Sequence, residues 1–457
     1  MRDDLTPVAR LAWFIVIILF PYVGVIGYIL FGEVQLGLTG EKRHDEIFEK
    51  LHKYAPQLLG GNNENLKNIE PEYQSGFAYS ASVEGFNTTL GNTAELMADA
   101  QSARIRMIED FDAAKETINV LYYIWLNDET GTNTANALIR AANRGVKVRV
   151  MADGLGSRKM LKSALWREMK EAGIETQIAL PFNNIIKTLI FSRFDLRNHR
   201  KITVIDSQVT YCGSQNCADP EFRVKPKYAP WIDIMMRLEG PVVAQNLLLF
   251  ASDWLMHKPD TPLDSFPIRP KQMVNGFPAQ VFADGPTGRK RSTPQMFSTL
   301  LSQAHERLVI SSPYFVPDYT VLNALCAAAH RGVDVTIIFP KRNDSFIVAA
   351  ASRSYYRRLL EAGVIIYEFK PGLLHSKTLT LDSKVTLIGS SNMDLRSFDL
   401  NYENNILLRD GATTRAVLAR QKDYISQSEE VHLTQVLAWP VYRRLWNNVI
   451  ATVGPVL

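Results

Sequence analysis

The sequence has few cysteines and little net charge. Three cysteines among 457 residues are too few for a disulfide framework, and none forms a CxxC pair that could hold zinc. The 51 Lys and Arg residues exceed the 47 Asp and Glu residues by four, giving a net charge of +4. This excess is too small to be the basic footprint of a nucleic-acid-binding protein. With 46% hydrophobic residues the chain is globular, and its length predicts two or three domains.

Charged residues are also absent from one segment near the amino terminus. Leu11 to Gly32 is an uncharged run of 22 residues. As a single helix it would be about 33 Å long, enough to cross a hydrocarbon core of about 30 Å. A cleaved signal peptide is the alternative, but the run is longer than usual and no small-x-small cleavage site follows it. We therefore predict a membrane anchor over 1–35, and the surrounding basic residues favour a cytoplasmic location for the rest of the chain.

The next segment, 36–95, first shows apolar residues at helical spacing and then becomes rich in Asn, Gly, Ser and Thr. These features are typical of an amphipathic connector that leads into a folded unit. No residue pattern in the connector indicates a particular chemistry.

The rest of the chain contains the same order of elements twice, which indicates an internal repeat. In each copy a β-rich run, Val146–Met151 or Val333–Phe339, follows a helical stretch that ends in Arg-Gly. This alternation predicts an α/β fold with a central sheet in each copy. We place the first repeat at 96–260 and the second at 261–457, because the region 258–280 is rich in proline and loop residues.

Each repeat ends in the same polar residues at the same spacing, an HxKxxxxD motif followed by GSxN. The members are, in the first copy and then the second, His199, Lys201, Asp206, Ser214 and Asn216, and His375, Lys377, Asp382, Ser390 and Asn392. A duplicated match of this length is not expected by chance. In a strand, His and Lys two positions apart project from one face. Two such halves related by a pseudo-twofold axis would bring both sets to one interface.

The paired residues suit transfer of a phosphoryl group through a covalent intermediate. One neutral imidazole could attack phosphorus to give a phosphohistidine, while the other, protonated, gives its proton to the leaving alkoxide. Lys201 and Lys377 would neutralise charge on the phosphoryl oxygens. The amides of Asn216 and Asn392 would donate hydrogen bonds to the same oxygens. This chemistry requires neither a metal ion nor another cofactor.

Four acidic residues near the motifs have two different expected roles. Asp206 and Asp382 belong to the catalytic motif, but we expect them to stabilise the local structure and the local electrostatic field rather than to contact the substrate. Asp233 and Glu403 are candidates to hydrogen-bond an imidazole and set its tautomer. The substrate-binding set predicted around the two imidazoles consists of Ser214, Asn216, Asp233, Ser390, Asn392 and Glu403.

The two HxKxxxxD motifs resemble those of the phospholipase D superfamily, and the resemblance extends to the bacterial cardiolipin synthases. RNHRKITVID, GSQNCADPEF, PWIDIMMRLEGPVV, LLHSKTLTLD and GSSNMDLRSFDLNYE all look like sequences of that family. The resemblance implies two phospholipase D-like α/β repeats packed as a pseudo-twofold pair, preceded by a transmembrane helix. It also implies transfer of a phosphatidyl group between two phosphatidylglycerols, giving cardiolipin and glycerol through a phosphohistidine without a metal or other cofactor.

The same resemblance implies the partners and the location. The partners would be phosphatidylglycerol and cardiolipin in the lipid bilayer, and no nucleic acid would bind. The protein would be located in the bacterial inner (plasma) membrane, with its catalytic domain in the cytoplasm. The resemblance favours His199 as the nucleophile. The family commonly has two membrane helices, whereas ten residues before Leu11 leave no room for another.

Other functions share the same motif. A hydrolytic phospholipase D, a phosphatidyltransferase that uses another alcohol such as serine, and a nuclease all cleave a phosphodiester, and the acceptor decides the product. The predicted anchor disfavours the nuclease. A scaffold with an inactive site is disfavoured because both His and both Lys residues are present.

The first repeat contains extra residues before its motif. Gly173 and His199 are 26 positions apart, whereas Gly363 and His375 are 12 positions apart. Within the extra residues, apolar side chains recur at helical spacing over 182–194, with basic residues between them. This pattern predicts an amphipathic helix near the cleft, which either enters the lipid interface or packs on the protein core.

Overall fold

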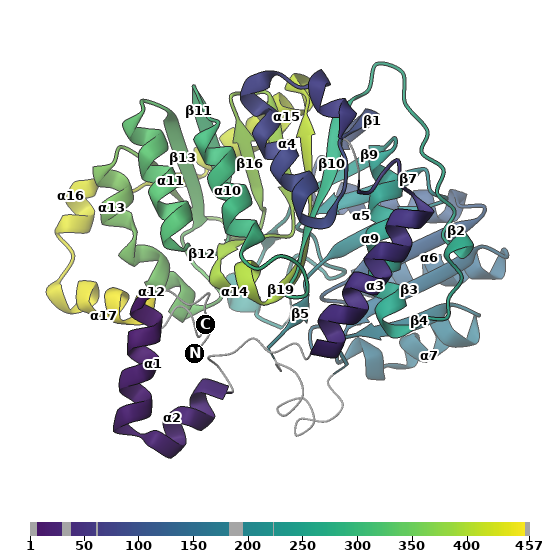
Figure 1. The fold of residues 1–457 in the computed structure, drawn as a ribbon, viewed down its shortest axis with the longest axis horizontal. Helices are drawn as coiled ribbons and strands as arrows, with labels where there is room; N and C mark the ends of the chain where they lie inside the picture. The colour runs from purple at the N-terminus through teal and green to yellow at the C-terminus, as the bar shows by residue number, and fades with distance from the viewer. Residues whose placement is uncertain (1–6, 30–37, 61–62, 182–194, 223, 453–457) are drawn as a thin grey trace.

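The two repeats contribute strands to one large mixed sheet with helices on its faces (Figure 1). The structure is a computed structural model that describes residues 7–29, 38–60, 63–181, 195–222 and 224–452. The predicted amphipathic helix at 182–194 lies outside the described residues.

Followed outward from the centre of the sheet, the first seven strands occupy equivalent positions in the two halves, and the second half has one additional strand at its edge. The first half runs β1 (Thr89–Leu96), β9 (Met235–Glu239), β7 (Val209–Gly213), β6 (Lys201–Ile205), β2 (Thr117–Tyr122), β3 (Lys147–Asp153) and β4 (Glu175–Ala179). The second half runs β10 (Phe277–Asp284), β19 (Asn401–Arg409), β17 (Val385–Gly389), β16 (Thr378–Leu381), β11 (Arg307–Ser311), β13 (Asp334–Pro340), β14 (Ile365–Phe369) and β20 (Ser428–Glu430). The central strands β1 and β10 pair antiparallel, as a twofold axis between them requires.

Short strands add two further links between the halves. β5 (Arg197–Asn198) pairs in parallel with β19, and β15 (Leu373–Leu374) pairs in parallel with β8 (Trp231–Ile232). Within the second half, β12 (Phe315–Val316) pairs with β18 (Met393–Asp394). The first two pairs matter most for function because each one immediately precedes a motif histidine.

Helices pack on the sheet in three main apolar clusters. The helices of the first half are α5 (Ala100–Ala113), α6 (Glu129–Asn143), α7 (Ala164–Glu171) and α9 (Val242–His257). Those of the second half are α10 (Ser292–Ser302), α11 (Tyr319–His330), α12 (Phe346–Ser354), α13 (Tyr356–Glu361), α14 (Leu395–Asp399), α15 (Gly411–Ser426), α16 (Leu433–Leu437) and α17 (Val441–Thr452). Short 3₁₀ turns lie at η2 (Glu64–Asn68), η3 (Met160–Lys162), η4 (Pro226–Tyr228) and η5 (Leu263–Ser265).

Local sequence explains where equivalent helices of the two halves begin and end. Asp128 and Asp318 each accept a hydrogen bond from a backbone N–H in the first turn of α6 or α11. Gly145 and Gly332 follow these helices with φ of +88° and +89°, values that favour glycine. The predicted glycine ends are confirmed, and the strands expected after them form as β3 and β13.

The segment predicted as a connector forms several elements of the fold. α3 (Leu38–Tyr54) packs against α9 of the first half. α4 (Pro71–Glu84) instead packs against α10 and β10 of the second half, where Phe77 is fully buried. This part of the chain therefore contacts both repeats.

The apolar run near the amino terminus forms two helices rather than the predicted single one. α1 (Pro7–Leu19) ends before Phe20, and α2 (Pro21–Gly27) begins at the next residue. Proline disfavours helical dihedrals in the residue before it, and Phe20 has φ −135° and ψ 70°. Among the described residues, no helix is both long enough and apolar enough to cross a membrane. This corrects the prediction of one continuous span over 11–32, of which 30–32 lie outside the described residues.

Candidate active site

The two motif histidines are held at equivalent positions by strands of the opposite repeat. The backbone N–H of His199 donates to the carbonyl of Tyr402 at 2.9 Å, next to the β5–β19 pair. The N–H of His375 donates to the carbonyl of Ile232 at 2.8 Å, next to the β15–β8 pair. Each histidine is therefore held next to an acidic residue of the other repeat, Glu403 on β19 or Asp233 directly after β8.

These pairings bring each imidazole against a carboxylate. Nδ1 of His199 lies 2.9 Å and 3.0 Å from the two carboxylate oxygens of Glu403. Nδ1 of His375 lies 2.6 Å from Oδ1 of Asp233. A carboxylate accepts the Nδ1 proton, which leaves Nε2 with its lone pair in the neutral imidazole. The sequence predicted that these acids would contact imidazoles but did not indicate that each would contact the histidine of the other repeat.

The predicted serines contact the carboxylates. Ser390 Oγ donates to Glu403, which also accepts hydrogen bonds from Ser397 Oγ at 2.9 Å and Asn401 Nδ2 at 3.1 Å. Ser214 Oγ donates to Asp233 at 2.6 Å. Burial alone would raise the pKa of Glu403, but the charges of its neighbours and these hydrogen bonds lower it, so the carboxylate is ionised.

Burial dominates the ionisation of the imidazoles. It lowers the pKa of His199 to about 4, although the charge of Glu403 opposes the shift. Burial and the charge of Lys377 lower the pKa of His375 to about 4, with Asp233 in opposition. Both rings are therefore neutral at pH 7, as a nucleophile must be.

The two motif lysines contact the backbone of the motif histidines. Lys201 Nζ donates to the carbonyl of His199 and Lys377 Nζ to that of His375, both at 2.6 Å. Burial lowers the pKa of Lys201 to about 8 and that of Lys377 to about 7. Lys201 is therefore mostly protonated at pH 7 and Lys377 about half protonated, and an anionic phosphoryl group bound near them would favour the ammonium form of both.

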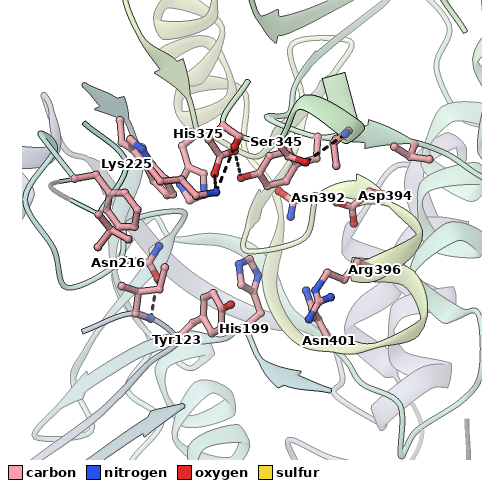
Figure 2. A pocket seen from close by; sticks show the side chains of 18 of the residues that line it. Tyr123, His199, Asn216, Lys225, Ser345, His375, Asn392, Asp394, Arg396 and Asn401 are labelled. Atoms are coloured by element: carbon pink, nitrogen blue, oxygen red, sulfur yellow. Dashed lines mark hydrogen bonds and ion pairs between the residues drawn. The ribbon is translucent and has the colours of Figure 1, made fainter. Parts of the chain in front are cut away.

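A cavity of about 420 Å³ lies above the two imidazoles. His199, His375, Asn216 and Asn392 all line it, so the structure brings together two predicted residues from each repeat (Figure 2). Asn216 Nδ2 is buried and has no hydrogen-bond partner among the described residues. A buried amide donor of this kind can bind an oxyanion in the cavity.

The two motif aspartates lie at the other end of the strands. Asp206 accepts hydrogen bonds from the backbone N–H groups of 115–117, each at 2.8 Å. Asp382 accepts equivalent bonds from 305–307, at 2.8 to 3.0 Å, and a further one from the Tyr73 hydroxyl at 3.0 Å. Neither residue is among those that line the cavity. Their contacts join the start of β2 or β11 to the end of the motif strand.

Several cavity residues were not singled out from the sequence. Tyr123 packs edge-on against His199, with ring centroids 4.9 Å apart, and Trp231 lies 4.4 Å from the His375 ring. Arg396 and Asn401 also line the cavity. Trp231, Arg396 and Asn401 occur within segments that resemble the family, which could have indicated their importance. No pattern around Tyr123 distinguishes it from other aromatic residues after buried strands.

The described residues offer no obvious metal site. Among them, no group of three or more His, Cys, Asp or Glu side chains has an arrangement that could hold a metal ion.

Comparison with known sequences identifies the family. A family model described as "Cardiolipin synthase, PLD-like domain" matches residues 107–247 and 297–423, and one described as "Phospholipase_D-nuclease N-terminal" matches residues 2–33. Cardiolipin synthase A of Proteus mirabilis (strain HI4320) is 34% identical over 455 residues, covering 98% of this chain and 93% of that protein. Cardiolipin synthase A of Klebsiella pneumoniae (strain 342) is 34% identical over 453 residues, with the same coverage.

Comparison with solved structures supports the fold. Phosphatidylserine synthase of Haemophilus influenzae Rd KW20 superposes with a TM-score of 0.62 over 80% of this chain and 95% of that chain. Its sequence identity of 17% supports a common fold alone. Together with the matched family model and the near full-length relatives, the duplicated motif leads to one conclusion: the chain belongs to the cardiolipin synthase family of the phospholipase D superfamily.

Proposed function

We propose that the protein synthesises cardiolipin, transferring the phosphatidyl group of one phosphatidylglycerol to a hydroxyl of a second and releasing glycerol. The observation that carries the proposal is the pair of imidazoles on one cavity, each bound at Nδ1 to an acid of the other repeat. Relatives called cardiolipin synthase A that align with 98% of the chain support this choice of substrate.

In the first step, Nε2 of one imidazole attacks the phosphorus of the donor lipid. The bond from phosphorus to the oxygen of the headgroup glycerol breaks. The other imidazole, protonated once the anionic substrate is bound, gives its proton to the leaving glycerol oxygen. The covalent product is a phosphatidyl-histidine. We assign the attack to His199, as the resemblance to the family favours, and the proton transfer to His375.

In the second step, a hydroxyl of the acceptor lipid attacks the phosphatidyl group. Its proton passes to the now neutral His375, and the bond between phosphorus and His199 breaks. Glu403 keeps the proton on Nδ1 of His199 in both steps, so Nε2 remains the reacting atom. Lys201, Lys377 and the Asn216 amide stabilise charge on the phosphoryl oxygens.

The proposed location is the bacterial inner membrane, with the catalytic part in the cytoplasm. Apolar side chains of the α1–α2 pair are exposed in the structure: Leu11, Phe14, Ile15, Val16, Ile18, Leu19, Phe20, Tyr22, Val23, Val25, Ile26 and Ile29. Exposed apolar area on this scale is characteristic of a membrane or protein contact. A phosphatidyltransferase also has to reach lipid substrates, which favours the membrane.

The test is to express the protein in bacteria that lack cardiolipin and to separate the extracted lipids by thin-layer chromatography. Cardiolipin should appear with the wild-type chain and not with His199→Ala or His375→Ala, each expected to lower the rate at least about 10²-fold. Phosphatidic acid as the main product would indicate hydrolysis, and phosphatidylserine would indicate another acceptor. Either result would contradict the proposal.

A further inference from the structure

The two repeats are equivalent at their motifs but differ in the cavity wall beyond them. Arg396 lies four positions after Asn392, whereas the corresponding residue after Asn216 is Pro220. A guanidinium group therefore lines the cavity on one side of the pseudo-twofold axis and has no counterpart on the other. A reaction between two lipids in one cavity requires such an asymmetry, because the donor and the acceptor have to be bound by different residues.

Arg396 is held at the start of α14 and is directed into the cavity. Its Nη2 donates to the carbonyl of Asp195 at 2.8 Å, which fixes the side chain against the segment before β5. Figure 2 shows the guanidinium pointing toward His199, beside Asn401. A planar guanidinium retains further donors after one such bond, and these can bind a phosphate.

Another part of the cavity wall is aromatic and apolar. Phe222 stacks on Trp231 with ring centroids 4.0 Å apart, and Trp231 in turn lies against His375. Ile124 and Val224 line the same region. This wall offers contacts to hydrocarbon, whereas the wall around Arg396 offers contacts to charged and hydroxyl groups.

Arg396 also differs from the other cation of the cavity wall. Lys225 Nζ lies 2.7 Å from the carboxylate of Asp344, so its charge is balanced. Among the described residues, no carboxylate lies at ion-pair distance from Arg396. Burial is the main cause that lowers the pKa of the nearby Arg197; the charges of Asp153 and Asp195 oppose this shift, and the positive charge of Arg396 adds to it. Asp394 also lines the cavity and interacts with the charge of Arg396 from beyond ion-pair distance, so the guanidinium is balanced only in part and can still bind an anion.

A hydrogen-bond acceptor accompanies this charge. Asn401 is buried, and its Nδ2 donates to Glu403, but its Oδ1 has no partner among the described residues. An unpaired buried carbonyl oxygen on a cavity wall can accept a hydrogen bond from a ligand hydroxyl. A guanidinium next to such an oxygen suits a ligand that joins a phosphate to a hydroxyl-bearing carbon chain.

We propose that Arg396 and Asn401 form the subsite for the headgroup of the acceptor lipid, with Arg396 on its phosphate and Asn401 Oδ1 on a glycerol hydroxyl. This inference rests on the proposed function. The acceptor is a phosphodiester whose reacting hydroxyl is one glycerol unit away from its phosphate. Arg396 holds this second phosphate while the hydroxyl oxygen forms the new bond to phosphorus, the bond to the histidine nitrogen breaks and the hydroxyl proton passes to the other imidazole.

The experiment compares two acceptors that differ in the second phosphate. Purified full-length protein in detergent micelles with phosphatidylglycerol is assayed for cardiolipin formation and, separately, for exchange of labelled glycerol into phosphatidylglycerol. Exchange uses the same donor and the same covalent step, but its acceptor is uncharged. Arg396→Gln should lower cardiolipin formation at least about tenfold while exchange stays within about twofold of wild type. Cardiolipin formation by Arg396→Lys should lie between that of Arg396→Gln and that of wild type, because lysine keeps the positive charge but lacks the planar guanidinium fork.

A matched control is Arg357→Gln, which removes an exposed guanidinium from α13, where its partner is Glu361. It should leave the ratio of the two activities unchanged. A parallel loss of both activities in Arg396→Gln would mean that Arg396 binds the donor lipid or stabilises the fold. Cardiolipin formation equal to that of wild type would mean that Arg396 does not bind the acceptor. Either outcome overturns the inference. Failure of the proposed function itself is distinguishable, because the wild-type protein would then form no cardiolipin.

Discussion

The hydrogen bond between His199 and Glu403 joins side chains that are 204 positions apart in the chain. Its equivalent between His375 and Asp233 spans 142 positions. Each imidazole therefore takes its tautomer from the opposite repeat, and neither repeat contains a complete pair by itself. A carboxylate in this position orients the ring and stabilises the imidazolium that forms during proton transfer.

Replacing either acid by its amide tests this role. Glu403→Gln and Asp233→Asn should each lower the rate of cardiolipin formation by about 10² or more, because the amide can stabilise the wrong tautomer of the ring and cannot balance an imidazolium charge. Ring ¹⁵N NMR should then show a change of tautomer at His199 in Glu403→Gln and at His375 in Asp233→Asn.

Ser390→Ala provides a control for the first variant. Ser390 donates to Glu403 without contacting His199. Loss of the Ser390 hydroxyl should therefore lower the rate of cardiolipin formation by about tenfold at most. If Glu403→Gln perturbed the His375 ring instead of His199, the cross-repeat assignment would be contradicted. A rate in Glu403→Gln equal to that of Ser390→Ala would reduce Glu403 to a structural role.

The sequence predicted the residues of the site better than their pairing. Identical spacing in two copies singles out His, Lys and Asn, because a chance duplicate is so improbable. Spacing within one repeat contains no information about which acid faces which imidazole, since that depends on strands β5 and β15 joining the other half. Arg396 and Asn401 lie in a segment that resembles the family, but the spacing of the second repeat does not indicate that α14 borders the cavity, so the sequence assigns them no role.

Helix α17 presents a row of apolar side chains to solvent. Val441, Tyr442, Leu445, Trp446 and Val449 are all exposed on it. The row continues onto α12, where the ring of Phe346 lies 6.2 Å from that of Trp446, and α12 also contributes Val348 to the cavity wall. This surface is therefore continuous with the site, and in the proposed location it would lie against the lipid interface.

Leu445→Asp tests this contact, because an aspartate on an exposed position should not unfold the helix but resists entry into lipid. The variant should lose about tenfold or more of its activity on long-chain phosphatidylglycerol in vesicles and keep its activity on a short-chain soluble substrate. Asn448→Asp adds the same charge to a neighbouring exposed position and is the matched control. Equal losses in the two variants would indicate repulsion of charge alone, and loss of the soluble activity would indicate damage to the fold.

The sequence predicted the regular helices and strands more accurately than the amino-terminal segment. Gly145 and Gly332 end their helices as expected because glycine adopts positive φ at no steric cost. Hydropathy alone predicted one helix from Leu11 onward, since a count of apolar residues does not register the effect of Pro21 on Phe20. The amphipathic helix expected over 182–194 remains a prediction.

Both repeats share one sheet, although the sequence suggested a central sheet for each of them. Strand β1 lies before the first recognisable repeat and β10 begins the second, so their antiparallel pairing at the centre was not visible in the pattern. Helix α4 precedes both repeats yet packs on α10. The two halves are therefore held together by a central strand pair, two short parallel pairs at the site and a helix from the preceding segment.

This arrangement predicts that the covalent link between the halves is dispensable once the protein has folded. The link passes through the turn at Val274, which is 87% exposed, so a protease site inserted after Val274 should be accessible. After cleavage the fragments should elute together and retain activity within about twofold, because an interface built from paired strands and buried helices does not depend on the loop. The same insertion without protease is the control. Separation of the fragments under native conditions, or loss of cardiolipin formation on cleavage but not on insertion, would show instead that the loop maintains the cross-repeat pairs at His199 and His375.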